Sequence, residues 1–259
     1  MTSKRTGILT AVVLSLVMSC TLQAQQNPDE KPVPEPVFSL GHDVGSVVHR
    51  FPHDQFTIYT APAHIGSTPH VWRYLVPFAV AAAFVPADRY ISANLPKGHG
   101  GRSATIANIG LDGTAATAGV FYIAGLARHD DHERETGMLA GESLLNSVIP
   151  HIALSMLFGR RRPYQGGPGE VGEGDFFARH SASASFPSGH SMFTWAMAST
   201  FADEYPSVPS KVLWYSVATT VTVSRVTGRE HFASDVIAGG AIGYLIAKHI
   251  YHRHHRATR

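Results

Sequence analysis

Six apolar segments recur along the chain and are separated by stretches rich in glycine and proline. Alanine, leucine, methionine and valine dominate these segments, and strict alternation of apolar and polar residues is rare, so the pattern favours helices over strands. A chain of 259 residues, 44% of them hydrophobic, can bury one well-filled core. We therefore predict an all-α helical bundle that forms one domain over residues 71–251. The apolar segments are residues 74–85, 106–126, 138–158, 191–201, 212–226 and 235–251.

The first 24 residues have the layout of a secretory signal peptide. Lys4 and Arg5 precede an apolar run over residues 8–18, which is short for a membrane span. Cleavage after Ala24 is the preferred interpretation, and a lipoprotein signal with lipidation at Cys20 is the alternative. Because Cys20 is the single cysteine, the mature fold has no internal disulfide. The sequence thus predicts an exported protein, either periplasmic or associated with the outer membrane.

The two ends of the mature chain differ in composition from the apolar segments. Residues 25–70 are rich in proline, aspartate and histidine, which predicts an extended arm with one short helix around residues 43–50. Residues 252–259 are predicted to form a solvated basic tail. The net charge of the whole chain is only +2 with neutral histidines, so nucleic acid is not an expected partner.

Most apolar segments are too short or too often interrupted to cross a membrane. A spanning helix needs about 20 mostly apolar residues, whereas Asp112, Glu142 and Asn146 lie inside the two longest segments. Glu142 and Asn146 are instead predicted to make a polar contact between helices. The sequence therefore favours a soluble or peripheral exported bundle. The alternative is an integral protein of the cytoplasmic membrane with its active site outside, which the basic residues 248–256 favour.

The first of three motifs is the run of arginines at residues 159–163. The residue before a proline is disfavoured in the α conformation, so the helix that includes Met138 is predicted to end at Arg162, before Pro163. A guanidinium group at that position suits bidentate recognition of phosphate. The alternative is a basic cap that complements the dipole of the helix C-terminus.

The second motif is Pro187-Ser188-Gly189-His190. Pro187 suits the first turn of a helix, and the backbone N–H groups of that turn lack partners within the helix. Such a helix end binds anions, and Gly189 would let a ligand approach the backbone closely. The alternative is an ordinary capped helix start.

The third motif contains Ser224, Arg225, His231 and Asp235. His231 and Asp235 are four residues apart, so they share one face of a helix. A carboxylate within hydrogen-bond reach of an imidazole fixes its tautomer and stabilises its cation. Arg225 could hold an anion beside that imidazole. The alternative is a histidine–aspartate pair on the surface at a helix start.

Together the motifs resemble the type 2 phosphatidic acid phosphatase superfamily, which also contains class A acid phosphatases and vanadium haloperoxidases. The family pattern is Lys-x6-Arg-Pro, then Pro-Ser-Gly-His, then Ser-Arg-x5-His-x3-Asp, and the match covers residues 138–243. The resemblance implies a helical bundle of that type, in which His231 attacks phosphorus, Asp235 orients His231, and His190 protonates the leaving group. It also implies that the phosphoryl oxygens are held by Arg162, Ser188, Gly189 and Arg225.

One position departs from the family pattern. The lysine of the first motif falls at Ser155, which cannot supply a positive charge. Arg160 is a poor substitute because family members often carry an arginine there in addition to the lysine. We therefore expect a weakened affinity for phosphate and an unchanged reaction class.

The predicted function is metal-independent hydrolysis of phosphate monoesters, lipid phosphates or pyrophosphates through a phosphohistidine. The expected partner is a small-molecule or lipid phosphate, no cofactor is expected, and vanadate should inhibit. The alternatives are a vanadate-dependent haloperoxidase and a non-catalytic anion-binding homologue. Residues 129–133 carry histidines and acids but are predicted to form a solvated loop, and residues 164–174 are predicted to shape substrate access.

Overall fold

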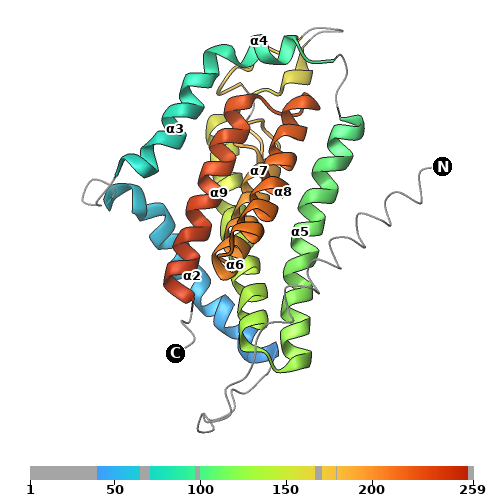
Figure 1. Ribbon diagram of the computed structural model, residues 1–259. Coiled ribbons are helices and arrows are strands. Elements are labelled where there is room, and N and C mark those ends of the chain that lie inside the picture. The colour runs from blue at the N-terminus through green and yellow to red at the C-terminus, as the bar shows by residue number, and fades with distance from the viewer. Residues whose placement is uncertain (1–39, 65–70, 97–99, 167–170, 179, 256–259) are drawn as a thin grey trace, which may run out of the picture. The chain divides into compact units, whose positions relative to one another are not determined.

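Every regular element in the computed structural model is a helix within the residues that it describes, namely 40–64, 71–96, 100–166, 171–178 and 180–255. This confirms the predicted all-α fold. The helices are α2 (Leu40–His64), α3 (Trp72–Phe84), α4 (Asp88–Ala93), α5 (Gly101–Arg128), α6 (Asp131–Phe158), α7 (Gly189–Glu204), α8 (Val208–Thr227) and α9 (Ala233–His254), with 3₁₀ turns η3 (Val85–Ala87) and η4 (Pro163–Gln165) (Figure 1).

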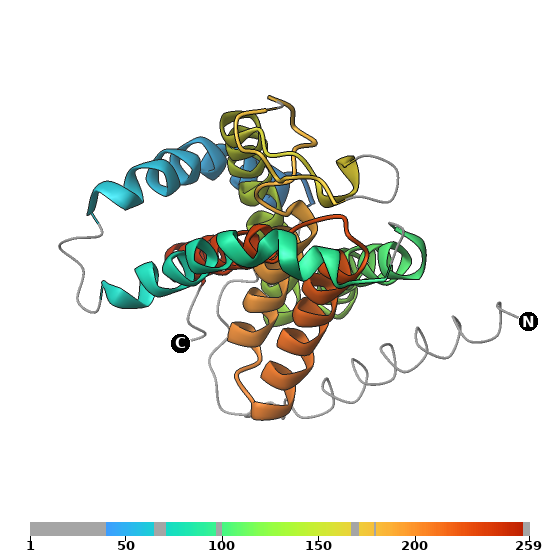
Figure 2. The same cartoon turned by 90° about the horizontal axis from the view of Figure 1, so that it is seen from above.

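Helix α7 is the central element of the bundle and packs against α5, α6, α8 and α9. Its side chains are buried on nearly every side, which explains why it lacks a polar face. The closest approach is to α9, where a Cβ atom on Gly243 would lie 2.0 Å from the Met192 carbonyl oxygen. Helix α3 in turn lies beside α9 (Figures 1 and 2). The α7–α9 pair is therefore the close-packed centre.

The order of the helices brings the three sequence motifs to one end of the bundle. Helices α6 and α8 run toward this end, and α7 and α9 start from it (Figure 1). The first motif follows α6, the second precedes and begins α7, and the third connects α8 to α9. Residues more than 60 positions apart in the chain thus become neighbours.

The prediction of an extended arm is wrong for residues 40–64, because they form the 25-residue helix α2. The guanidinium group of Arg50 pairs with the buried Glu142 carboxylate on α6. Gln55 Nε2 donates to Asn146 Oδ1 at 2.7 Å. These bonds confirm the predicted polar contact between helices at Glu142 and Asn146, and they explain why a polar sequence folds here: it supplies partners that the buried groups of α6 need.

The prediction of a solvated tail over residues 252–259 is also wrong at its start, because α9 continues to His254. His254 Nε2 lies 2.9 Å from the carboxylate of Asp54 on α2, and His255 Nδ1 lies 3.1 Å from Glu204 Oε1. Both carboxylates are buried, so these histidines provide the polar partners that burial demands. The unit Phe38–Arg259 is compact and includes parts of the predicted arm and tail. The predicted signal segment, with Cys20 and Ala24, lies outside the described residues.

Two stretches of the described residues are long and apolar enough to cross a membrane, Leu75–Ala93 and Gly101–Arg128. This is a statement of length and composition alone. The second stretch is α5 and the first combines most of α3 with η3 and α4. Both are compatible with membrane association.

Candidate active site

Residues of all three motifs are joined by direct hydrogen bonds at the end of the bundle. The Ser188 amide donates to the Asp235 carbonyl at 3.1 Å, which links the second motif to the third. Arg162 Nη1 donates to Glu230 Oε2 at 3.2 Å, which links the first motif to the third. The structure therefore brings the predicted residues together in one site.

His231 is buried, and its imidazole is held in one tautomer. Nδ1 donates to the Ser185 carbonyl oxygen at 2.6 Å, and a carbonyl can only accept, so Nδ1 carries the hydrogen and Nε2 keeps a lone pair. Burial lowers the pKa of His231 well below its usual value, and the positive charges of Arg162 and Arg225 lower that pKa further. The imidazole is therefore neutral at physiological pH and can act as a nucleophile through Nε2.

The sequence led us to expect a hydrogen bond between Asp235 and His231, but these two side chains do not form one. Its Oδ2 lies 3.9 Å from His231 Nδ1, beyond hydrogen-bond distance. Instead Oδ2 accepts from the Ser185 hydroxyl at 2.5 Å and from the Phe232 amide at 2.9 Å. Asp235 thus fixes Ser185, whose carbonyl fixes His231. Asp235 therefore orients the imidazole through one intermediate residue, Ser185.

Arg160 completes the support of Asp235 and was not expected to matter at the site. Its Nη1 donates to Asp235 Oδ1 at 2.6 Å, and its Nη2 donates to Asp88 Oδ2 at 2.8 Å. The guanidinium group lies between the rings of Phe176 and Phe232, at 4.5 and 4.3 Å from their centroids. Arg160 is therefore a buried positioning group. Asp88 is 72 residues away in the chain, and no motif marks it.

Two arginines converge on one carboxylate. Arg162 Nη1 and Arg225 Nη2 donate to the same oxygen, Glu230 Oε2, at 3.2 and 3.4 Å. Arg162 Nε is anchored by the Ser183 carbonyl at 3.1 Å. Arg225 Nε is buried and has no hydrogen-bond partner among the described residues. Two guanidinium groups that share one anionic oxygen could also hold the oxygen of another anion, and Glu230 was not singled out from the sequence.

The second motif presents the start of α7 to this site. The helix begins at Gly189 with Ser188 as its N-cap, so the prediction of Pro187 in the first turn is wrong. The backbone of Ser188 is extended, so the loop continues through Ser188 and the helix begins at the next residue. Ser188 Oγ is buried without a partner among the described residues. This hydroxyl and the amides of the first turn are thus available to a phosphate.

The helix before the first motif ends earlier than predicted. Helix α6 ends at Phe158, four residues before Arg162, because Gly159 adopts the left-handed conformation (φ 50°) that closes helices. Arg162 itself is extended before Pro163, as predicted.

His190 lies in the first turn of α7 with its imidazole held by α5. Nε2 donates to Asn108 Oδ1 at 2.8 Å, a contact that no sequence motif indicates. Burial, followed by the charges of Arg225 and Arg162, lowers the pKa of His190 to about 4. The imidazole is therefore neutral at physiological pH, and a bound phosphate dianion would raise that pKa.

His151 lies near Ser155, the position at which the family pattern has a lysine. Ser155 is buried in α6, and its hydroxyl has no partner among the described residues. His151 is one turn earlier on α6, and a Cβ atom on Gly189 would lie 3.0 Å from its Nε2. Burial and the charge of Arg162 lower the pKa of His151. A neutral imidazole thus borders the anion site, and the glycine at 189 leaves room for it.

Two further regions lie away from the motifs or at their edge. Residues 131–133 begin α6 instead of forming a solvated loop, because Asp130 caps the helix by accepting from the Glu133 amide at 2.9 Å. Of residues 164–174, Gly174 accepts from Arg160 Nε at 3.0 Å, and residues 167–170 lie outside the described residues.

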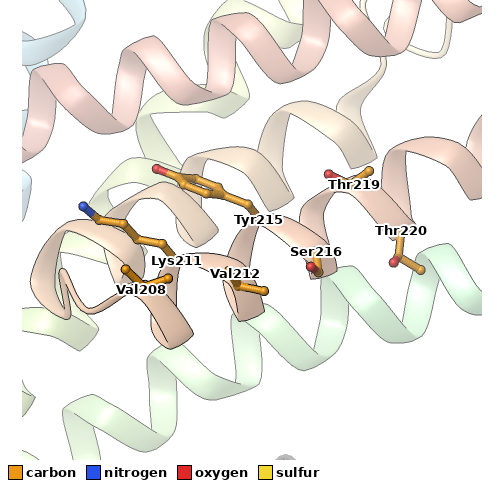
Figure 3. A pocket seen from close by; sticks show the side chains of 7 residues that line it. All are labelled: Val208, Lys211, Val212, Tyr215, Ser216, Thr219 and Thr220. Carbon is orange, nitrogen blue, oxygen red and sulfur yellow. The ribbon is translucent and has the colours of Figure 1, made fainter.

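An open pocket on α8 is lined by residues of that helix alone, none of them from the motifs (Figure 3).

Comparison with known proteins agrees with the resemblance drawn from the motifs. Residues 136–259 match the PAP2 superfamily. A segment of 70 residues is 39% identical to the lipid A 1-phosphatase of Porphyromonas gingivalis; this segment is 26% of the present chain and 16% of that protein. No solved structure matches. The matching residues contain all three motifs at the end of the bundle.

Proposed function

We propose that the chain is a phosphatase of lipid phosphates that uses His231 as its nucleophile; the match of residues 136–259 to the PAP2 superfamily supports this proposal. One observation carries the proposal: a buried, neutral imidazole with a fixed tautomer lies beside two convergent arginines. The tautomer leaves Nε2 free to attack, and the arginines supply the positive charge that holds a phosphoryl group.

Substrate binding replaces one anion with another. The phosphoryl oxygens take the place of Glu230 Oε2 between Arg162 and Arg225, and they accept hydrogen bonds from the Ser188 hydroxyl and the first amides of α7. These donors are fixed by helix ends before the substrate arrives. Such preorganisation lowers the cost of charge rearrangement in the transition state.

The chemical step transfers the phosphoryl group to His231. Nε2 attacks phosphorus, the bond from phosphorus to the ester oxygen breaks, and His190 donates a proton to the departing alkoxide. Water then attacks phosphorus and gives a proton to His190, while the bond from phosphorus to His231 Nε2 breaks and inorganic phosphate is released. Guanidinium groups stabilise the charge in both steps, and we propose that no metal ion takes part.

The surroundings of the site favour a lipid substrate. Phe84, Val85 and Tyr90 are exposed on the segment that contains Asp88, the partner of Arg160. Phe177 is exposed on the loop that follows the first motif. Apolar side chains at the edge of an anion site suit a phosphate that carries acyl chains. The P. gingivalis relative is named for action on a lipid phosphate.

The test is phosphate release by the wild type and by His231→Ala. We expect the wild type to act faster on detergent-dispersed lipid phosphates than on short soluble esters. His231→Ala should lose turnover by about 10³-fold or more, because no other group replaces the nucleophile. A quenched reaction of the wild type should contain an acid-labile phosphohistidine. His53→Ala, at an exposed histidine of α2, is the control and should remain active. Turnover of His231→Ala within tenfold of the wild type would contradict the mechanism.

A further inference from the structure

A cluster of titratable side chains lies at the end of the bundle opposite the motifs, where α6 begins and where α7 and α9 end (Figure 1). His132 and Glu135 come from the first turns of α6, Glu204 is the last residue of α7, and His255 follows α9 directly. Ligand atoms of Glu135, Glu204 and His255 all lie within 4.8 Å of one another. Nothing in the phosphatase proposal uses these residues.

Among the described residues, the buried Glu204 carboxylate is held by histidines and by one hydroxyl, since Thr136 Oγ1 donates to its Oε2 at 3.4 Å. His255 Nδ1 lies 3.1 Å from Glu204 Oε1 and 3.4 Å from Glu135 Oε1. One ring nitrogen carries at most one hydrogen, so it cannot serve both carboxylates fully. The Glu204 side chain is 0% exposed, and its ion pairs among the described residues are with histidines, not with arginine or lysine. A metal ion beside this buried carboxylate would supply a stronger positive charge than the histidines do.

The separations between His255 Nδ1 and the two carboxylate oxygens agree with those in a tetrahedral metal centre. Zinc binds histidine nitrogen and carboxylate oxygen at about 2.0–2.2 Å, so two ligand atoms of a tetrahedral site lie about 3.3 Å apart. The two separations that involve His255 Nδ1 are 3.1 and 3.4 Å. Imidazole and carboxylate together suit zinc better than calcium or magnesium, which prefer oxygen ligands alone.

We propose that Glu135, Glu204 and His255 bind a zinc ion that joins the ends of three helices. His132 helps to orient Glu204, since its Nδ1 lies 3.4 Å from the other oxygen of that carboxylate. The side chains of Glu135 and His255 are 18% and 27% exposed, which leaves a path for the ion and room for a water as fourth ligand. The ion stabilises the fold and takes no part in phosphate chemistry at the other end.

The test is zinc binding by the full chain, produced without a histidine tag and stripped with a chelator. We expect titration calorimetry to show one zinc ion per chain with a dissociation constant of about 1 μM or tighter, and the melting temperature to rise by several degrees. Magnesium at the same concentration should have no such effect. Glu204→Gln, Glu135→Gln and His255→Ala should each weaken zinc binding at least tenfold.

His252→Ala is the matched control, because His252 is an exposed histidine of the same helix end and lies outside the cluster. It should bind zinc as the wild type does. Circular dichroism of the metal-free variants shows whether each is folded, and Glu135→Gln, at a partly exposed position, is the variant least likely to disturb the core. Equal zinc affinity in the wild type and Glu135→Gln, or loss of binding in His252→Ala, would overturn the proposal. Phosphate release measured alongside is expected to be unchanged by the chelator, so the two proposals fail separately.

Discussion

At the scale of single residues, Glu230 occupies the position between two arginines where we propose that a phosphate binds. Its carboxylate accepts from both Arg162 and Arg225. A phosphate or vanadate ion must displace this carboxylate or bind beside its negative charge. Either course costs free energy, so Glu230 lowers the affinity of the site for anions.

We expect Glu230→Gln to bind vanadate about three- to tenfold more tightly, because the amide keeps the size of the side chain and removes its charge. Competitive inhibition of phosphate release and direct calorimetric titration would both measure this change. Glu173→Gln is the control, since Glu173 pairs with Arg89 where both side chains are more than half exposed. Weaker binding by Glu230→Gln would mean that the carboxylate is needed to hold the arginines in place.

The sequence marked the candidate site residues better than the residues that support them. His231, His190 and Arg225 belong to short motifs, and the structure brings these motifs to one end of the bundle. Asn108 and Asp88 were missed because their partners are 82 and 72 residues away, and a side chain within an ordinary helix carries no mark of such a contact. His151 was missed for the same reason, because its contact with Gly189 joins residues that are far apart in the chain.

At the scale of helices, the α7–α9 contact sets the geometry of the site. Gly239 and Gly243 lie one turn apart on α9, and Cβ atoms there would lie 2.5 Å from the Ser188 carbonyl oxygen and 2.0 Å from that of Met192. Ser188 also donates its amide to the Asp235 carbonyl. The spacing of these two helices therefore fixes the second motif relative to the third.

We expect Gly243→Ala to destabilise the protein by about 2 kcal/mol or more, because backbone atoms of α7 cannot move aside as a flexible side chain would. Denaturant unfolding would measure the change, and activity should fall with it as the helices separate. Gly141→Ala on α6 is the control, since a Cβ atom there meets nothing within 4 Å. It should be neutral or stabilising by up to about 1 kcal/mol. A neutral Gly243→Ala would contradict the tight contact.

The helices that periodicity predicted are those with long apolar runs, and α2 is the exception. Its sequence contains Pro52 and several histidines, so local composition argued for an arm. Its stability depends on bonds to Glu142 and Asn146 in α6, and such tertiary contacts are invisible in a local window. The end of α6 at Phe158 was missed because the left-handed glycine outweighed the proline four residues later.

At the scale of the whole molecule, apolar surface remains uncovered. Only 17% of the apolar window in Leu75–Ala93 and 28% of that in Gly101–Arg128 is buried, whereas a core helix would be mostly buried. On α3, one exposed stripe has the i, i+4 spacing of a single helix face. Its members are Trp72, Val76, Val80 and Phe84. Asp112 is exposed in the middle of α5, and a charge in that position is costly within a bilayer. The combination favours binding to a membrane surface through α3.

We therefore expect the protein to float with lipid vesicles in a density gradient and to be released from membranes by alkaline carbonate. Val76→Glu combined with Val80→Glu should abolish flotation, because two charges on the exposed stripe oppose its entry into the apolar layer. Val212→Glu, at an exposed position on α8, is the control and should leave flotation intact. Phosphate release from a short soluble ester should be the same in all these variants, since none of them touches the motifs. Resistance to carbonate with release by detergent alone would instead establish an integral protein, and failure of the wild type to float would leave the bundle soluble.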